Sequence, residues 1–278
     1  MNIWDIGISS IGRTNLTYEL FEAYRDAQIK AMEISLAFNV QGLNYALDVF
    51  RNCGLSEAAE YAKQTGVELW SYHLPFDHNE VNPAALNSDV RKNTLNADSE
   101  MIKAIGDIGI KKAVIHASGE PIPDCDRAES MKCAKETLFL LNEVAKKSGV
   151  VLAVENLPRT CLGKNSAEIL ELISVDPAIK VCFDVNHLLE ESHKSFVENV
   201  GEQIVTLHVS DYDFIDERHW APGKGKIDWA ELIELLKNVG YNGYFLNEVA
   251  AVMESEKTAE NITMAELKAM NDKIFARK

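Results

Sequence analysis

Four apolar, strand-like segments in the second half of the chain each end in a side chain that can bind a metal ion. These side chains are Glu155, Asp184, His208 and Glu248. Three carboxylates and one imidazole can hold Mg²⁺, Mn²⁺, Co²⁺ or Zn²⁺; the oxygen ligands favour the first two ions, and the imidazole keeps the other two open. Pairing of each acid with a lysine or arginine is the alternative, but basic residues are scarce near these segments. We therefore predict one divalent metal ion at these residues.

Two of the predicted ligands also suit acid–base chemistry. Three carboxylates more than neutralise one divalent cation, so one of them can serve as a base beside the metal. Glu155 and Glu248 would each face one side of a substrate carbon, while the metal polarises a carbonyl and a hydroxyl and stabilises an enediolate. This arrangement predicts a proton-transferring isomerase or epimerase with Glu155 and Glu248 as catalytic residues.

The elements that must position these residues alternate between strand and helix along the whole chain. The predicted strands are residues 3–9, 31–35, 67–73, 112–116, 150–155, 181–187, 204–208 and 243–248. Eight strands, each followed by a helix, predict a (β/α)8 TIM barrel of the α/β class, with residues 1–278 as a single domain. A doubly wound open sheet is the runner-up. The barrel is favoured because the carboxyl ends of its strands meet at one mouth, whereas an open sheet would spread the four ligands along a line.

Several helix ends can be predicted from capping residues. Thr17 is the expected N-cap of the first helix, and Gly66 follows the end of a helix over residues 56–64. Asn165 with Glu168, and Asp228 with Glu231, have the spacing of capping boxes. A short additional helix is expected over residues 45–51, and residues 258–276 are expected to close the chain as a helix.

Composition excludes several other classes of protein. The chain has 278 residues and a net charge of −15, which disfavours nucleic acid as a partner because a strongly acidic protein repels polyphosphate. Five cysteines without a Cys-x-x-Cys pair fit a reducing compartment. We expect no secretory signal, because no basic segment followed by an apolar run opens the sequence, and no stretch reaches the ~18 apolar residues of a membrane span. We therefore expect a cytoplasmic protein without membrane contact.

Five short motifs resemble the xylose-isomerase-like barrel superfamily, in the branch of sugar-phosphate isomerases/epimerases that includes ketose 3-epimerases and inosose dehydratases. The motifs are residues 153–156 (AVEN), 183–187 (FDVNH), 207–211 (LHVSD), 222–229 (PGKGKIDW) and 247–248 (NE). The resemblance covers essentially the whole chain and implies a small carbohydrate substrate. It also implies that the four ligands bind one metal, that the two glutamates exchange the proton at C3, and that His187 and Arg218 contact substrate oxygens.

Other residues are weaker candidates for substrate contacts. They are His73, His116, Glu33 and His219, and Glu33 could instead brace a neighbouring side chain. Trp4, Phe38 and Trp220 could form an apolar wall for a sugar ring, and Lys224 could touch a phosphate. The scarcity of loop arginines (Arg13, Arg159 and Arg218) favours an unphosphorylated substrate.

Several alternatives share this fold. Inosose dehydratases are lyases, and a barrel could also bind sugar without catalysis. Endonuclease IV, a zinc phosphodiesterase of the same superfamily, binds three zinc ions with additional histidines. Its Asp-x-His pair would correspond to Glu217 and His219 here. The resemblance also suggests a homodimer or homotetramer, for which the partly apolar segment of residues 36–50 is the only local indication.

Overall fold

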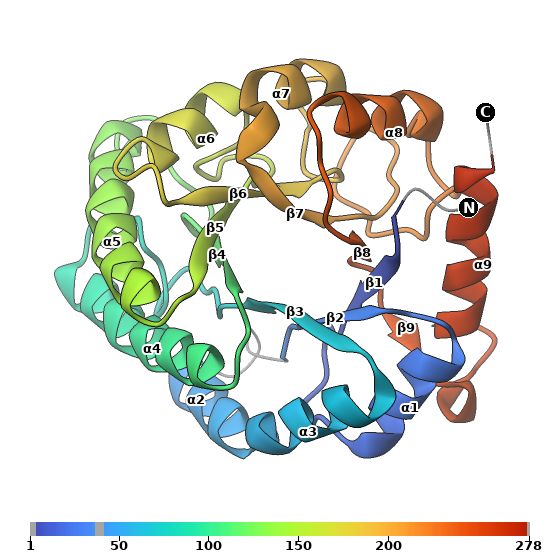
Figure 1. Ribbon diagram of the computed structural model, residues 1–278. Helices are drawn as coiled ribbons and strands as arrows, with labels where there is room; N and C mark the ends of the chain where they lie inside the picture. Colours follow the sequence, from blue (N-terminus) through green and yellow to red (C-terminus); the bar gives the residue numbers. More distant parts are fainter. Residues whose placement is uncertain (1–3, 37–41, 277–278) are drawn as a thin grey trace.

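Eight parallel strands form a closed barrel in the computed structural model, which describes residues 4–36 and 42–276 (Figure 1). The strands are β1 (Ile6–Ser9), β2 (Ala31–Ile34), β3 (Glu68–His73), β4 (Lys112–His116), β5 (Val151–Glu155), β6 (Lys180–Asp184), β7 (Ile204–His208) and β8 (Phe245–Asn247). They are paired in chain order, and β1 pairs with β8. Just beyond β7, the Val209 amide donates to Leu246 O at 2.8 Å and Val209 O accepts from the Glu248 amide at 3.0 Å. These bonds close the ring, so the predicted barrel is confirmed.

Helices surround the strands on the outside of the barrel (Figure 1). They are α1 (Tyr18–Asp26), α2 (Leu43–Asn52), α3 (Leu55–Thr65), α4 (Ser88–Asp107), α5 (Arg127–Lys147), α6 (Ser166–Ile173), α7 (His193–Val200), α8 (Trp229–Asn238) and α9 (Met264–Phe275). The short 3₁₀ helices η1 (Gly201–Gln203) and η2 (Glu254–Glu256), and the paired strands β9 (Ala251–Val252) and β10 (Ile262–Thr263), complete the fold. None of the helices in the described part of the chain is long and apolar enough to cross a membrane.

Most of the predicted helix ends are confirmed. Thr17 caps α1 by accepting from the Leu20 amide at 3.4 Å, and Gly66 ends α3 with a φ of 74°. The additional helix expected over residues 45–51 is α2. Asp228 caps α8 by accepting from the Glu231 amide at 3.1 Å, but the Glu231 side chain does not complete the predicted capping box. Polar N-caps mark the starts of α1 and α8, and a left-handed glycine marks the end of α3, as capping chemistry predicts.

Two further predictions near helix starts were wrong in detail. Asn165 does cap α6, but the Glu168 carboxylate does not complete a capping box; it binds Arg127 at 2.6 Å and the Gly163 amide at 2.9 Å instead. The last helix begins at Met264 rather than near residue 258, because Thr263 and Glu266 form the capping box there. The preceding residues form η2 and β10. At the start of α6, the pairing of Glu168 with Arg127 prevented the capping box. Before α9, the pairing of β10 with β9 took the place of the predicted first helical turn.

The barrel interior below the carboxyl ends of the strands is filled by side chains. Val114, Ala153 and Cys182 form a buried apolar cluster from β4, β5 and β6. Trp70 on β3 donates its indole N–H to Thr206 Oγ1 on β7 at 3.0 Å. A packed interior of this kind gives the strand ends a rigid base, which is what a site built from several strands requires.

Candidate active site

The four predicted metal ligands meet at the carboxyl end of the barrel. Glu155, Asp184 and His208 are the last residues of β5, β6 and β7, and Glu248 directly follows β8. His208 Nδ1 lies 3.0 Å from Glu155 Oε1, 3.5 Å from Glu248 Oε2 and 4.0 Å from Asp184 Oδ2. Potential ligand atoms of all four residues lie within 4.8 Å of one another. The barrel thus brings together residues that are up to 93 positions apart in the sequence (248 − 155).

Hydrogen bonding fixes which nitrogen of His208 faces this cluster. His208 Nε2 lies 3.1 Å from Glu33 Oε2, and a carboxylate can only accept, so Nε2 carries a proton. Nδ1 of a neutral His208 is then bare, yet it faces three carboxylates. Only a second proton or a cation between these atoms can make that arrangement favourable.

The donor atoms themselves fit a cation. Four buried atoms of the cluster have no hydrogen-bond partner, namely Glu155 Oε1, Asp184 Oδ2, His208 Nδ1 and Glu248 Oε2. One unpaired atom from each residue, all turned toward a common point, is what a metal site needs and what an ordinary core would not tolerate. Burial and the nearby charges of Glu248 and Glu155, opposed by His187, raise the pKa of Asp184 to about 8. A divalent cation would relieve this crowding of anions.

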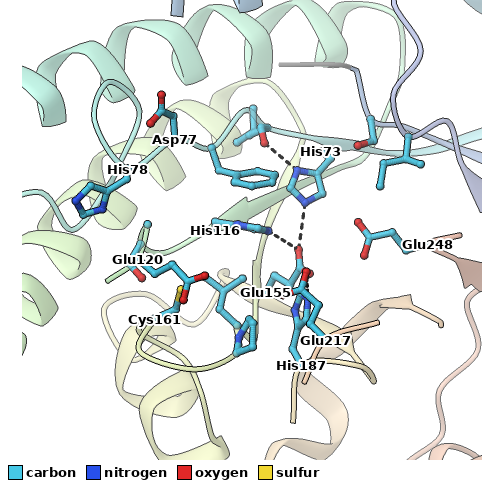
Figure 2. A pocket seen from close by; sticks show the side chains of 18 of the residues that line it. His73, Asp77, His78, His116, Glu120, Glu155, Cys161, His187, Glu217 and Glu248 are labelled. Atoms are coloured by element: carbon cyan, nitrogen blue, oxygen red, sulfur yellow. Dashed lines mark hydrogen bonds and ion pairs between the residues drawn. The ribbon is translucent and has the colours of Figure 1, made fainter. Parts of the chain in front are cut away.

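A second set of histidines contacts the other oxygen of Glu155. His73 donates from Nδ1 to the Leu74 carbonyl at 2.8 Å, which directs its Nε2 to Glu155 Oε2 at 3.2 Å. His116 Nε2 lies 3.2 Å from the same oxygen. Figure 2 shows both rings pointing at Glu155, with Glu248 facing it from the other side. Glu155 therefore presents one oxygen to the four-residue cluster and the other to this histidine pair.

A third group lies nearer the surface and includes a residue outside the predicted site. Glu217 Oε1 lies 2.9 Å from His219 Nε2 and 3.8 Å from His187 Nε2. Both histidines direct Nε2 toward Glu217 because Nδ1 donates to a backbone carbonyl. This carbonyl is that of Asn156 at 2.9 Å for His187 and that of Glu248 at 3.3 Å for His219. This group has metal-ligand geometry as well. Sequence reasoning considered Glu217 only for the endonuclease alternative, from its Glu-x-His spacing.

A cavity of about 580 Å³ opens above these groups. The predicted site residues that line it are Glu155, Glu248, His73, His116, His187 and His219. Asp184, His208 and Glu33 lie deeper and are fully buried. Arg218 is not among the lining residues; its Nε pairs with Asp213 at 3.1 Å, and its guanidinium lies 5.9 Å from the Trp220 ring. The two glutamates therefore line the cavity, whereas Arg218 is not among its lining residues.

The apolar wall of the cavity differs from the predicted one. Trp4 is a core residue whose indole donates to the Tyr241 carbonyl at 2.9 Å, and Phe38 lies outside the described residues. Trp220 is partly exposed and does not line the cavity. Phe76 does line it, with its ring stacked on His116 at 4.0 Å between centroids. Phe76 follows Pro75 in a loop, where no periodic pattern could identify it.

Comparisons with known proteins agree with the barrel fold. A family model described as xylose isomerase-like TIM barrel matches residues 21–272. An uncharacterised protein of Methanocaldococcus jannaschii is 28% identical over 211 residues, covering 73% of this chain and 71% of that protein. The fructoselysine 3-epimerase of Escherichia coli O157:H7 is 26% identical over 127 residues, covering 44% and 46%. The crystal structure of a D-tagatose 3-epimerase-like protein superposes with a TM-score of 0.78 and 24% identity, covering 98% of this chain and 96% of that one.

Proposed function

The chain belongs to the xylose isomerase-like TIM-barrel family, and we propose that it is a divalent-metal-dependent isomerase or epimerase of a small carbohydrate. The observation that carries this proposal is the set of four unpaired, buried donor atoms on Glu155, Asp184, His208 and Glu248 at the floor of the cavity. A bound divalent cation would supply positive charge to substrate oxygens as the adjacent carbon loses its proton. The relatives and structural neighbours named as epimerases are consistent with this reaction class.

Proton transfer falls to the two glutamates. Glu155 and Glu248 both line the cavity and approach His208 from different strands. Burial alone would raise the pKa of each carboxyl, but the neighbouring histidines outweigh it; His208 and His116 hold the pKa of Glu155 well below its ordinary value, and His208 and His219 lower that of Glu248. Both are therefore ionised at neutral pH and able to accept a proton from carbon. One glutamate removes the proton and the other returns one to the opposite face.

The remaining polar residues of the cavity orient the substrate. His187 and His219 present Nε2 to the cavity, each held by a backbone carbonyl at Nδ1. Phe76 and Leu157 supply apolar surface for the carbon skeleton. A cavity of about 580 Å³ accommodates a monosaccharide-sized molecule.

Solvent isotope exchange tests this proposal. Metal-reconstituted protein is incubated in heavy water with a panel of ketoses and aldoses, and the carbon-bound deuterium of each sugar is located by NMR. Deuterium at one carbon next to a carbonyl, lost after treatment with a chelator and restored by the metal, is the expected result. A product lighter by one water would instead assign the lyase reaction. Turnover without solvent deuterium would contradict transfer through two exchangeable carboxylates.

A second candidate function is favoured by the number of ligand groups. Three groups of side chains could each hold a cation, and the first two share Glu155 and His208. The groups are His73, Glu155 and His208; Glu155, Asp184, His208 and Glu248; and His187, Glu217 and His219. Such a site resembles that of the zinc phosphodiesterase endonuclease IV. The net charge of −15 disfavours a DNA substrate. Metal analysis of the purified protein separates the two: one ion per chain supports the isomerase, whereas three zinc ions and cleavage of abasic DNA would support the nuclease.

A further inference from the structure

We propose that the rim of the cavity rejects phosphorylated substrates, because the groups that would bind a phosphate there are already occupied by the protein's own carboxylates. This inference rests on the proposed function and specifies its substrate class as an unphosphorylated carbohydrate. It identifies Glu120 and Asp216, acting through Arg159, as residues that determine specificity. None of them belongs to the metal-ligating groups described above.

Arg159 is the one arginine or lysine among the described residues that line the cavity. Its guanidinium contacts three carboxylates: Nη2 lies 2.6 Å from Glu120 Oε1, and Nη1 lies 2.9 Å from both Asp216 Oδ1 and Glu217 Oε2. Within this group of four side chains, three carboxylates around one guanidinium give a net charge of −2. Arginine is the preferred side chain for bidentate phosphate binding, but here both edges of the guanidinium are taken. In Figure 2, Glu120 and Glu248 lie on opposite sides of the pocket.

The other arginines near the mouth are neutralised in the same way. Arg13 makes two hydrogen bonds to Glu256, both at 2.7 Å. Arg218 pairs with Asp213 at 3.1 Å and lies 3.9 Å from Asp216. A phosphate approaching either guanidinium would have to displace a carboxylate that is already in place.

In the glycine-rich loop between β7 and α8, the backbone amides are likewise already hydrogen-bonded to a carboxylate of the protein. Backbone N–H groups converging in a loop commonly bind phosphate, but here they bind Asp211, which is fully buried. Asp211 Oδ2 accepts from the Gly223 amide at 2.8 Å, and Oδ1 accepts from the Ile227 amide at 3.2 Å. A Cβ on Gly225 would lie 2.3 Å from Asp211 Oδ1, so only glycine lets the loop close this tightly. The amides of this loop are therefore satisfied by an internal carboxylate and are not available to bind a phosphate.

The negative charge of the rim carboxylates therefore favours binding of a free sugar over binding of its phosphate. A phosphate at the outer end of the cavity would approach Glu120 and Glu217, which line it, while Arg159 is already paired with both and with Asp216. The negative charges of the phosphate and of these carboxylates repel each other. A neutral hydroxyl suffers no such repulsion and can donate a hydrogen bond to the same carboxylates.

Removal of one carboxylate should convert the rim into a phosphate site. The dissociation constants of an unreactive hexitol and its 6-phosphate are measured by calorimetry for four metal-reconstituted proteins: wild type, Glu120→Gln, Glu120→Gln with Arg159→Leu, and Glu100→Gln. The last is the matched control, because Glu100 makes a similar bidentate pair with Arg51 outside the cavity and its loss changes the net charge by the same amount.

The wild type should bind the free hexitol more tightly than the phosphate. Glu120→Gln should shift the ratio of the dissociation constants for hexitol and hexitol 6-phosphate at least tenfold in favour of the phosphate. Addition of Arg159→Leu should reverse that shift. Glu100→Gln should leave the ratio unchanged. Preference of the wild type for the phosphate, or equal shifts in Glu120→Gln and Glu100→Gln, would overturn the proposal. A protein that binds the hexitol selectively but places no deuterium in any sugar would overturn the proposed function while supporting the selectivity.

Discussion

His208 donates its Nε2 proton to Glu33 across 3.1 Å, and this hydrogen bond turns Nδ1 toward the carboxylate cluster. Glu33 is fully buried at the end of β2 and is held in turn by Ser71 Oγ, which donates to Glu33 Oε2 at 2.8 Å. The sequence left open whether Glu33 contacts substrate or braces a neighbour. Its position behind His208, away from the cavity surface, favours the bracing role.

Replacement of Glu33 should therefore weaken metal binding. Carboxylates that accept from a metal-bound histidine typically contribute 10–100-fold in metal affinity. We expect Glu33→Ala to raise the metal dissociation constant by about that factor. Glu33→Gln, which keeps an acceptor oxygen but loses the charge, should have a smaller effect, and Ser71→Ala smaller still. Competition with a chromophoric chelator measures the three constants, and an unchanged affinity in Glu33→Ala would contradict this role.

Glu→Gln variants at Glu155 and Glu248 should lose proton exchange from opposite epimers. If Glu155 serves one epimer and Glu248 the other, Glu→Gln at either position should lower epimerisation by about 10²–10⁴-fold. Each variant should still exchange the proton of the one epimer that its remaining glutamate can deprotonate, without inverting the carbon. Deuterium exchange is followed by NMR starting from each epimer, at saturating metal so that lost affinity does not contribute. Equal loss of exchange from both epimers in both variants would rule out a division of labour between the two bases.

Much of this fold follows from local sequence patterns. Lys112–His116 and Ile204–His208 were predicted with the bounds that the structure has, because each is a short apolar run ending in a polar residue. The convergence of the four ligand residues followed from the closed barrel. Strand ends are predictable here because burial and parallel pairing impose the same pattern on each strand.

The parts that were not predicted depend on contacts between distant residues. Arg159 reaches Glu120 and Asp216, which are 39 and 57 positions away, and no periodicity marks such pairs. The Glu168 carboxylate binds Arg127, 41 positions away, instead of completing a capping box. The rim of the cavity is built from loops, where sequence patterns are weakest and tertiary contacts decide side-chain positions.

Asp211 should be important for the stability of the loop that carries Glu217 and His219. Its two carboxylate oxygens accept four hydrogen bonds, from the amides of residues 212, 223 and 227 and from the indole of residue 229. Asp211→Asn replaces one acceptor oxygen with a donor and leaves buried N–H groups unpaired, at a cost of about 1–3 kcal/mol each. Chemical denaturation should show a loss of at least that size. Asp213→Asn, on the same loop, should cost less because its side chain is partly exposed; equal losses would contradict the role of the buried carboxylate.

The metal-free protein should lose stability as the pH rises above neutrality. Burial lowers the pKa of His187, but Asp184 and Glu217 outweigh it and raise the pKa from 6.5 to about 10. Burial likewise lowers the pKa of His219, and Glu217 and Glu248 raise it from 6.5 to about 9. A raised pKa means that the folded protein holds the proton more tightly than the unfolded chain. The resulting stability is complete below about pH 6.5 and is lost as the pH rises through the folded values.

Thermal unfolding of chelator-treated protein at several values between pH 6 and about pH 10 measures this loss. The melting temperature should fall across the range, and Asp184, with its pKa raised to about 8, contributes in the same direction over the lower part of it. Metal-loaded protein should show a smaller fall, since the cation replaces protons in balancing the carboxylates. Glu217→Gln removes the shared partner of His187 and His219 and should flatten the profile. A melting temperature that rises between pH 7 and about pH 9 in the metal-free wild type would show that these histidines are not held protonated by the fold.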